Sequence, residues 1–142
     1  QILEDGDRLF RNDIEIKGIK YTQQKNFSIQ IGDIIERSLK DGDIVLLNRQ
    51  PTLHRGSMLA QKVKVRPYKT IRMNLAITKT FNADFDGDEM NIHLAQSVQA
   101  RNELQRITNV KYQIVGAKDS SPIIGCVQDS VSGAFASASV AF

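Results

Sequence analysis

The middle of the chain has short apolar runs, some of which alternate with polar residues, as in strands that bury one face. This pattern predicts strands near 44–47, 58–66, 71–78 and 91–94, after a short strand over 13–17. Turns are expected at Pro51, at Arg66-Pro67 and at Gly87, because proline and glycine interrupt regular structure. Successive short strands of this kind indicate a barrel-like β arrangement.

Helical spacing of apolar residues appears on both sides of this middle part. Before it, isoleucines and a leucine between Ile29 and Leu39 give a broken helical pattern, predicting one helix that ends before Asp41-Gly42-Asp43. After it, Ser97 is expected to cap a helix over about 98–107. A second helix is expected to begin near Pro122 or Ile123.

These elements predict an α+β, mainly β fold in three parts. The parts are an N-terminal flank over 1–40 with a short strand and a helix, a β core over 41–95 with a metal loop at 82–91, and a helical flank over 96–142. The 142 residues, 41% of them hydrophobic, suffice for one ordinary domain with a real core.

Three aspartates, Asp84, Asp86 and Asp88, stand at alternate positions within the sequence Asn-Ala-Asp-Phe-Asp-Gly-Asp-Glu-Met-Asn at 82–91. Carboxylates this close raise one another's pKa unless a cation joins them. On a straight strand they would lie roughly 7 Å apart, too far for one magnesium ion with ligands at about 2.1 Å. We therefore expect Gly87 to bend the chain around one point, where oxygen ligands favour magnesium, manganese or calcium over zinc.

Three other kinds of loop have closely spaced acidic residues: an EF-hand, a different calcium loop and a solvated acidic turn. An EF-hand loop counted from Asp84 requires glycine at its sixth position and glutamate at its twelfth, but this chain has Glu89 and Ala95 there. The sequence therefore excludes an EF-hand. A structural calcium loop of another kind and a solvated acidic turn both remain open.

Charge is segregated along the chain, which has a net charge of +3. Between Ile44 and Ala83 there is no Asp or Glu, whereas eight basic residues fall there: Arg49, Arg55, Lys62, Lys64, Arg66, Lys69, Arg72 and Lys79. A basic segment that leads into a carboxylate cluster suits a site that binds a polyanion beside a metal. About half of these cations are expected only on a solvated face, because several alternate with apolar residues.

Two separated motifs are Val-Leu-Leu-Asn-Arg-Gln-Pro-Thr-Leu-His-Arg at 45–55 and Asn-Ala-Asp-Phe-Asp-Gly-Asp at 82–88. Together they closely resemble the active-site region of the largest subunit of multisubunit DNA-dependent RNA polymerases. The resemblance covers nearly the whole chain, and Glu-Met-Asn-Ile-His at 89–93 resembles the archaeal, eukaryotic and nucleocytoplasmic viral branch. That branch usually continues Val-Pro-Gln-Ser, where this chain has Leu-Ala-Gln-Ser at 94–97.

The resemblance implies a double-psi β-barrel with flanking helices, and an activity. The three aspartates would hold a permanent catalytic Mg²⁺, and a second Mg²⁺ would arrive with the nucleoside triphosphate. The RNA 3′-hydroxyl would attack the α-phosphate, and pyrophosphate would leave. Arg49 and Asn82 would reach the ribose hydroxyls, assisted by Gln50.

Three further residues near the motifs are placed outside the core site. Glu89 adjoins the aspartates and is considered a contributor to a second metal or to the surroundings of the first. His54 and His93 each lie beside a motif, but a histidine among apolar residues is more often a packing residue than a catalytic acid.

The resemblance also implies partners. The chain is too short for a complete polymerase and begins at Gln1, so we expect a fragment that is inactive alone. The second-largest subunit, other polymerase subunits, the DNA template, the RNA product and nucleoside triphosphates are its expected partners.

The single cysteine excludes an intramolecular disulfide, and neither a signal peptide nor an apolar run of roughly 20 residues is present. We therefore expect no membrane partner and an intracellular location. That location would be the nucleus for a eukaryotic enzyme and the cytoplasm for an archaeal or viral one.

Two alternative functions remain at this point. A two-barrel RNA-dependent RNA polymerase of silencing pathways has a similar triple-aspartate loop but no close match to residues 49–55. A non-enzymatic, metal-stabilised or nucleic-acid-binding module would need the carboxylates for stability and would not depend on them for nucleotide addition.

Overall fold

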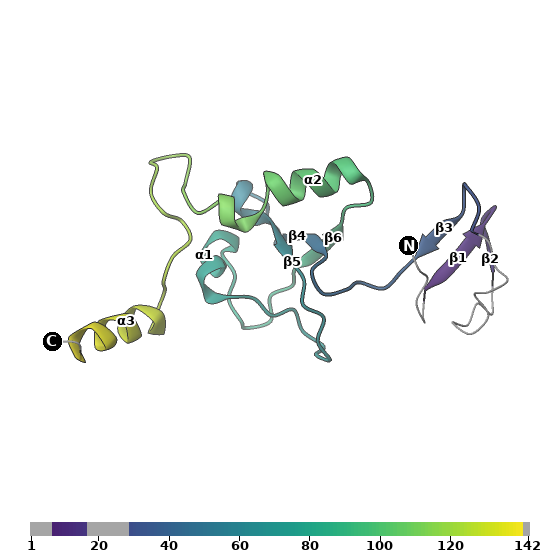
Figure 1. The fold of residues 1–142 in the computed structure, drawn as a ribbon. Helices are drawn as coiled ribbons and strands as arrows, with labels where there is room; N and C mark the ends of the chain where they lie inside the picture. The colour runs from purple at the N-terminus through teal and green to yellow at the C-terminus, as the bar shows by residue number, and fades with distance from the viewer. Residues whose placement is uncertain (1–6, 17–28, 141–142) are drawn as a thin grey trace. The chain divides into compact units, whose positions relative to one another are not determined.

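The computed structural model describes residues 7–16 and 29–140, which belong to two compact units that divide after Lys40 (Figure 1). The first unit contains the strands β1 (Arg8–Arg11), β2 (Ile14–Glu15) and β3 (Ile34–Glu36). They form an antiparallel sheet in the order β2-β1-β3. Leu9 of β1 pairs with Ile35 and is almost fully buried, so the central strand anchors this sheet.

Two predictions for the first unit have different outcomes. The strand predicted over 13–17 is confirmed at 14–15, and residue 17 lies outside the described residues. The helix predicted before Asp41 is wrong, because the described part of that segment contains strand β3 and no helix. Its isoleucines had suggested a helical spacing, but pairing with β1 satisfies their backbone groups in a sheet.

The second unit is built on another antiparallel sheet, in the order β5-β4-β6. Its strands are β4 (Ile44–Asn48), β5 (Met58–Lys62) and β6 (Asn91–Leu94). The predictions for 44–47 and 91–94 are confirmed, whereas the strand predicted over 58–66 ends at Lys62. Asp41 accepts the Val65 N–H at 2.6 Å and so holds the chain in a different path after the strand.

The predicted strand over 71–78 is wrong, because a short helical segment stands there. The Asn74 side chain accepts the Ala76 N–H at 2.9 Å and so caps a 3-10 turn over Leu75–Ile77. The helix α1 (Thr78–Phe81) follows directly. This segment buries Ile77 and Phe81 in a core with Leu47 and Leu59 of the sheet, whereas Leu75 is exposed.

The C-terminal part contains two longer helices. The helix α2 (Val98–Arg106) confirms the predicted helix, and the Ser97 hydroxyl caps it by accepting the Ala100 N–H at 3.1 Å. The helix predicted near Pro122 is wrong at that place, because Pro122 forms a β-bridge with Val115. The helix α3 begins only at Asp129 and runs Asp129–Val140, with no buried residue.

The described residues thus form a small α+β fold with two antiparallel three-stranded sheets and no closed barrel. Two shorter 3-10 turns complete it, at Arg55–Ser57 and Val110–Tyr112. Within these residues, no helix is both long enough and apolar enough to span a membrane.

Candidate metal centre

The aspartate loop lies between α1 and β6 and begins with a sharp change of direction. Asn82 ends α1 in the left-handed conformation, with φ of 47°. Five residues later, Gly87 has φ of 123°, which a glycine adopts without the steric cost of a side chain. These two positions bend the chain, as expected for Gly87, and join the helix to the strand through a tight loop.

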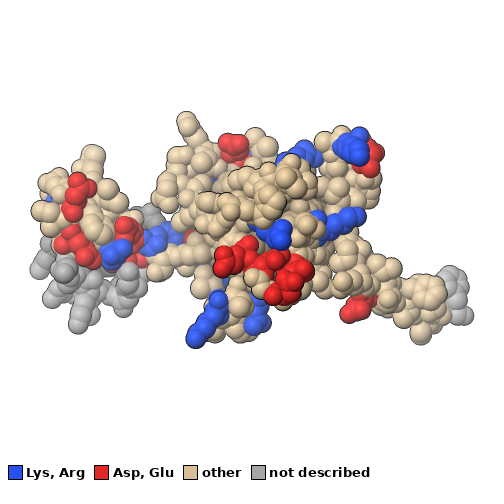
Figure 2. Space-filling view, turned by 180° about the vertical axis from the view of Figure 1, so that it is seen from behind, with Lys and Arg blue, Asp and Glu red and all other residues tan. Residues whose placement is uncertain are grey.

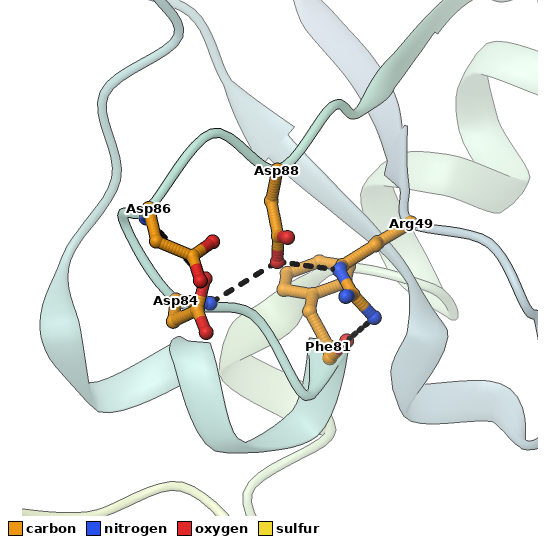
Figure 3. A network of polar contacts seen from close by, with 5 residues as sticks. All are labelled: Arg49, Phe81, Asp84, Asp86 and Asp88. Atoms are coloured by element: carbon orange, nitrogen blue, oxygen red, sulfur yellow. Dashed lines mark hydrogen bonds and ion pairs between the residues drawn. The ribbon is translucent and has the colours of Figure 1, made fainter.

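The loop brings the three predicted aspartates together. One oxygen from each of Asp84, Asp86 and Asp88 lies within 4.8 Å of the others, and all three residues are exposed. Figure 3 shows their carboxylates directed toward one another. The loop is closed by the Asp86 N–H, which donates to Asp84 Oδ1 at 3.3 Å, and by the Asp84 N–H, which donates to Asp88 Oδ2 at 3.2 Å.

This donor set fits one hard divalent cation. Two ligands on opposite sides of a magnesium ion lie about 4.2 Å apart, and around calcium the distance is about 5 Å. The three oxygens lie within 4.8 Å of one another, a limit that falls between these two values, and carboxylates are the ligands that these ions prefer.

Arg49 joins this cluster from the end of β4. Its Nε donates to Asp88 Oδ2 at 2.9 Å, and its Nη1 donates to the Phe81 carbonyl at 3.3 Å (Figure 3). The side chains of Arg49 and Asp88 are 20% and 22% exposed, so water screens the pair only in part. Arg49 therefore ties the first motif of the sequence to the second.

The neighbours shift two pKa values in opposite directions. The Arg49 guanidinium, followed by the Asp84 N–H, lowers the pKa of Asp88 below its ordinary value of 3.8. The Asp84 carboxylate, which can share a proton with Asp86, raises the pKa of Asp86, and the charge of Asp88 adds to this effect. The cluster therefore favours the ionised form of Asp88 and disfavours the ionised form of Asp86.

The other predicted residues lie at different distances from the loop. Asn82 directly precedes it and is exposed. Gln50 is also exposed, and among the described residues no hydrogen bond links it to the aspartates. His54 caps the 3-10 turn that starts at Arg55, because its Nδ1 accepts the Gly56 N–H at 3.0 Å. His93 lies on β6 and lines a separate cavity of about 580 Å³ beside α2.

A second cavity, of about 760 Å³, adjoins the aspartates. Residues 69–73 line it, together with residues of the loop between Ala83 and Asn91, Glu89 among them. We call this cavity the loop cleft. Figure 2 shows a central patch of acidic side chains, with basic side chains above and below it and further acidic side chains elsewhere on the same view.

Sequence reasoning did not identify two features of this site. The Phe81 carbonyl, which orients Arg49, has no signal in the sequence because every residue has a carbonyl. Lys69 and Arg72 were noted only as members of the basic segment, and their position beside the aspartates depends on the path of the chain between β5 and α1.

Comparison with known proteins agrees with the two motifs. The family model for RNA polymerase Rpb1, domain 2, matches residues 6–110. A probable DNA-directed RNA polymerase II subunit RPB1 homolog of Invertebrate iridescent virus 6 is 45% identical over 134 residues, which are 94% of this chain and 13% of the relative.

Two cellular relatives are similar to the same region. The DNA-directed RNA polymerase subunit Rpo1N of Methanothermobacter thermautotrophicus is 51% identical over 76% of this chain and 12% of the relative. The DNA-directed RNA polymerase III subunit RPC1 of Saccharomyces cerevisiae is 43% identical over 89% of this chain and 9% of the relative.

The chain therefore belongs to the RNA polymerase Rpb1 domain 2 family. It spans only about a tenth of the length of these relatives.

Proposed function

We propose that this chain is the catalytic-centre segment of the largest subunit of a DNA-directed RNA polymerase. The proposed reaction transfers a nucleotide from a nucleoside triphosphate to the RNA 3′-hydroxyl. The observation that supports it most strongly is the loop in which Asp84, Asp86 and Asp88 converge, inside the region that the family model matches.

In this proposal the aspartates hold a divalent cation, Mg²⁺ in the cell. Bound there, together with a second ion that arrives with the nucleotide, it would activate the attacking hydroxyl and stabilise the leaving pyrophosphate. The protein keeps the ligands in place, since Asp88 is fixed by Arg49 and by the Asp84 N–H. Protonation and metal binding compete for the same oxygens, so the raised pKa of Asp86 makes this competition stronger there than at Asp88 as pH falls.

Arg49 and Asn82 would bind the ribose of the incoming nucleotide, with Gln50 beside them. Within the described part of the chain, Arg49 makes hydrogen bonds through Nε and Nη1 and none through Nη2. It therefore has donors left for a ribose hydroxyl while it remains attached to Asp88. Asn82, in its left-handed conformation, stands two residues before the first aspartate, Asp84.

The proposed context is a larger assembly. In the described residues, β5 and β6 are the outer strands of their sheet. The outer edge of β5 is already bonded at one point, where the Ala60 N–H donates to the Thr108 carbonyl at 3.1 Å. No described strand pairs with the outer edge of β6, which can accept a further strand. We propose that other parts of the complete subunit extend this sheet into a double-psi β-barrel. The second-largest subunit, the other polymerase subunits, the DNA template and the RNA product would complete the site, so the segment alone would be inactive.

The test is nucleotide addition by the full enzyme on a primed RNA–DNA scaffold. Asp84, Asp86 and Asp88 are changed singly to Asn, and extension is measured across a magnesium titration with scaffold binding measured in parallel. We expect loss of extension with scaffold binding retained. Glu103→Gln is the control, because this exposed acid lies on α2, away from the loop.

Other outcomes would identify the alternatives. Near-normal extension in any two of the three variants would contradict the proposal and indicate a structural loop. Extension on an RNA template with none on a DNA template would favour an RNA-dependent polymerase.

A further inference from the structure

The loop cleft is lined by charges of both signs. Asp84, Asp88 and Glu89 of the aspartate loop line it, and so do Lys69 and Arg72 of the segment before α1. Within the described ranges, no ion pair joins these acidic and basic side chains. The charges therefore face a common space without neutralising each other directly.

Lys69 and Arg72 differ from their neighbours in the sequence. Arg66 donates to the exposed Asp41 at 3.3 Å, and the Val65 N–H, followed by Arg66 and Lys64, lowers the pKa of that carboxyl. Lys69 and Arg72 have no acidic partner among the described residues. Two cations of the basic segment thus interact with Asp41, and two remain available at the cleft.

Arg72 is also held in position. Its Cζ lies 3.7 Å from the centre of the Tyr68 ring, which is a close cation–π contact. Such stacking covers the face of the guanidinium and leaves its N–H groups at the edge free to donate. A planar group with several donors at a fixed place is well suited to bind phosphate oxygens.

We propose that Lys69 and Arg72 form a phosphate-binding surface in the same cleft as the aspartate loop, and that the loop cleft takes the phosphates of the nucleoside triphosphate or of pyrophosphate. The inference rests on the proposed function and adds the residues that hold the phosphates. A polyphosphate carries several negative charges. It can therefore contact both a metal ion held by the carboxylates and the basic side chains of Lys69 and Arg72. The cleft volume is also within the roughly 300–1,000 Å³ typical of small-molecule sites.

The experiment uses the full polymerase that contains this segment, with Lys69→Gln, Arg72→Gln and the double variant. Lys62→Gln is the matched control, because Lys62 is exposed in the same basic segment but lies outside the cleft. The measured quantities are KM and kcat for nucleotide addition, KM for pyrophosphate in the reverse reaction, and scaffold affinity across a salt series.

We expect each single variant to raise KM for the triphosphate and for pyrophosphate about tenfold, as for loss of a charged hydrogen bond at an exposed site. Scaffold affinity and its salt dependence should stay unchanged, and Lys62→Gln should behave like wild type. Unchanged KM values would overturn the inference. So would a weaker, less salt-dependent scaffold interaction with normal KM values, since that result assigns these cations to the nucleic-acid backbone.

Two further variants separate phosphate binding from a structural role. Arg72→Lys keeps the charge and should recover part of the KM defect. If Arg72 acted only by supporting Tyr68, then Tyr68→Leu would reproduce the Arg72→Gln defect. In that case Lys69→Gln would have no effect on KM. This combination of results would contradict the inference.

Failure of this inference is distinct from failure of the proposed function. In the first case wild-type enzyme extends RNA and still needs the three aspartates. In the second case extension persists without them.

Discussion

Arg11–Asp33 in the first unit and Arg49–Asp88 in the second are arginine–aspartate pairs with different surroundings. In the first unit, Arg11 binds Asp33 through two parallel hydrogen bonds, Nε to Oδ1 at 2.8 Å and Nη2 to Oδ2 at 2.7 Å. In the second, Arg49 offers Asp88 only its Nε, and two further carboxylates stand beside that pair. The Arg11–Asp33 pair is complete, since both carboxylate oxygens accept from the arginine. The Arg49–Asp88 pair belongs to a cluster with excess negative charge.

The pKa values express this difference. The Arg11 guanidinium, followed by the Gln30 N–H, lowers the pKa of Asp33 from 3.8 to about 2. In the aspartate loop Arg49 lowers the pKa of Asp88, but the neighbouring carboxylates raise that of Asp86. An arginine–aspartate pair therefore stabilises the fold where the charges balance. Where additional carboxylates leave a net negative charge, the cluster favours binding of a cation.

The largest expected effect tests which of the two clusters binds metal. Asp86→Asn in the full enzyme should weaken one Mn²⁺ site by more than about tenfold, and up to about a hundredfold, because a charged ligand is lost. Asp33→Asn should leave all Mn²⁺ sites unchanged, because Asp33 is already satisfied by Arg11. Mn²⁺ titration followed by electron paramagnetic resonance measures both variants, and equal effects would remove the distinction between the two clusters.

A smaller effect is expected from changing the arginine of the loop. Arg49→Lys keeps the charge but removes the planar donors, so discrimination between ribonucleotides and deoxyribonucleotides should fall about tenfold. Arg11→Lys, at the complete pair, should leave this discrimination unchanged. Competitive extension with the two nucleotide classes measures the ratio, and normal selectivity in Arg49→Lys would refute the role of Arg49 at the ribose.

The smallest effect concerns acid stability of the first sheet. Because the pKa of Asp33 is lowered on folding, its contribution is present above its ordinary value of 3.8 and is lost as pH falls toward about 2. Amide signals of β1 should therefore shift toward unfolded positions over this interval in the 142-residue chain, as followed by nuclear magnetic resonance. Asp33→Asn should weaken the sheet at neutral pH and remove this acid step.

The control for the acid step is Asp13→Asn. Asp13 is exposed in the turn between β1 and β2, and its left-handed backbone also suits asparagine. This variant should keep the acid step. If it abolished the step instead, the titration could not be assigned to the Arg11–Asp33 pair.

The alternating aspartates predicted a metal loop with a bend at Gly87, and the structure places their oxygens together. This prediction was possible because the evidence is local. Closely spaced carboxylates favour a cation in any fold, and one glycine allows the bend that brings them together. The same is true of α2, whose cap and apolar spacing lie within ten consecutive residues. The role of the loop in catalysis stays a prediction.

Contacts between distant segments decided the rest. Isoleucines before Asp41 fit a helix or a strand, and only the partner strand β1 made them a strand. The segment after residue 70 had alternating polarity, but the Asn74 cap and burial of Phe81 in the core made it helical. Neither the spacing nor the composition of those segments contains this information.

The sequence by itself determined the chemistry of the loop, because carboxylate spacing and the conformational freedom of glycine are properties of adjacent residues. The tertiary structure decided which cation neutralises which carboxylate. It paired Arg49 with Asp88 across 39 positions and brought Lys69 and Arg72 to the same cleft as the loop. Electrostatic partners depend on distance in space, which the order of residues does not give until the chain has folded.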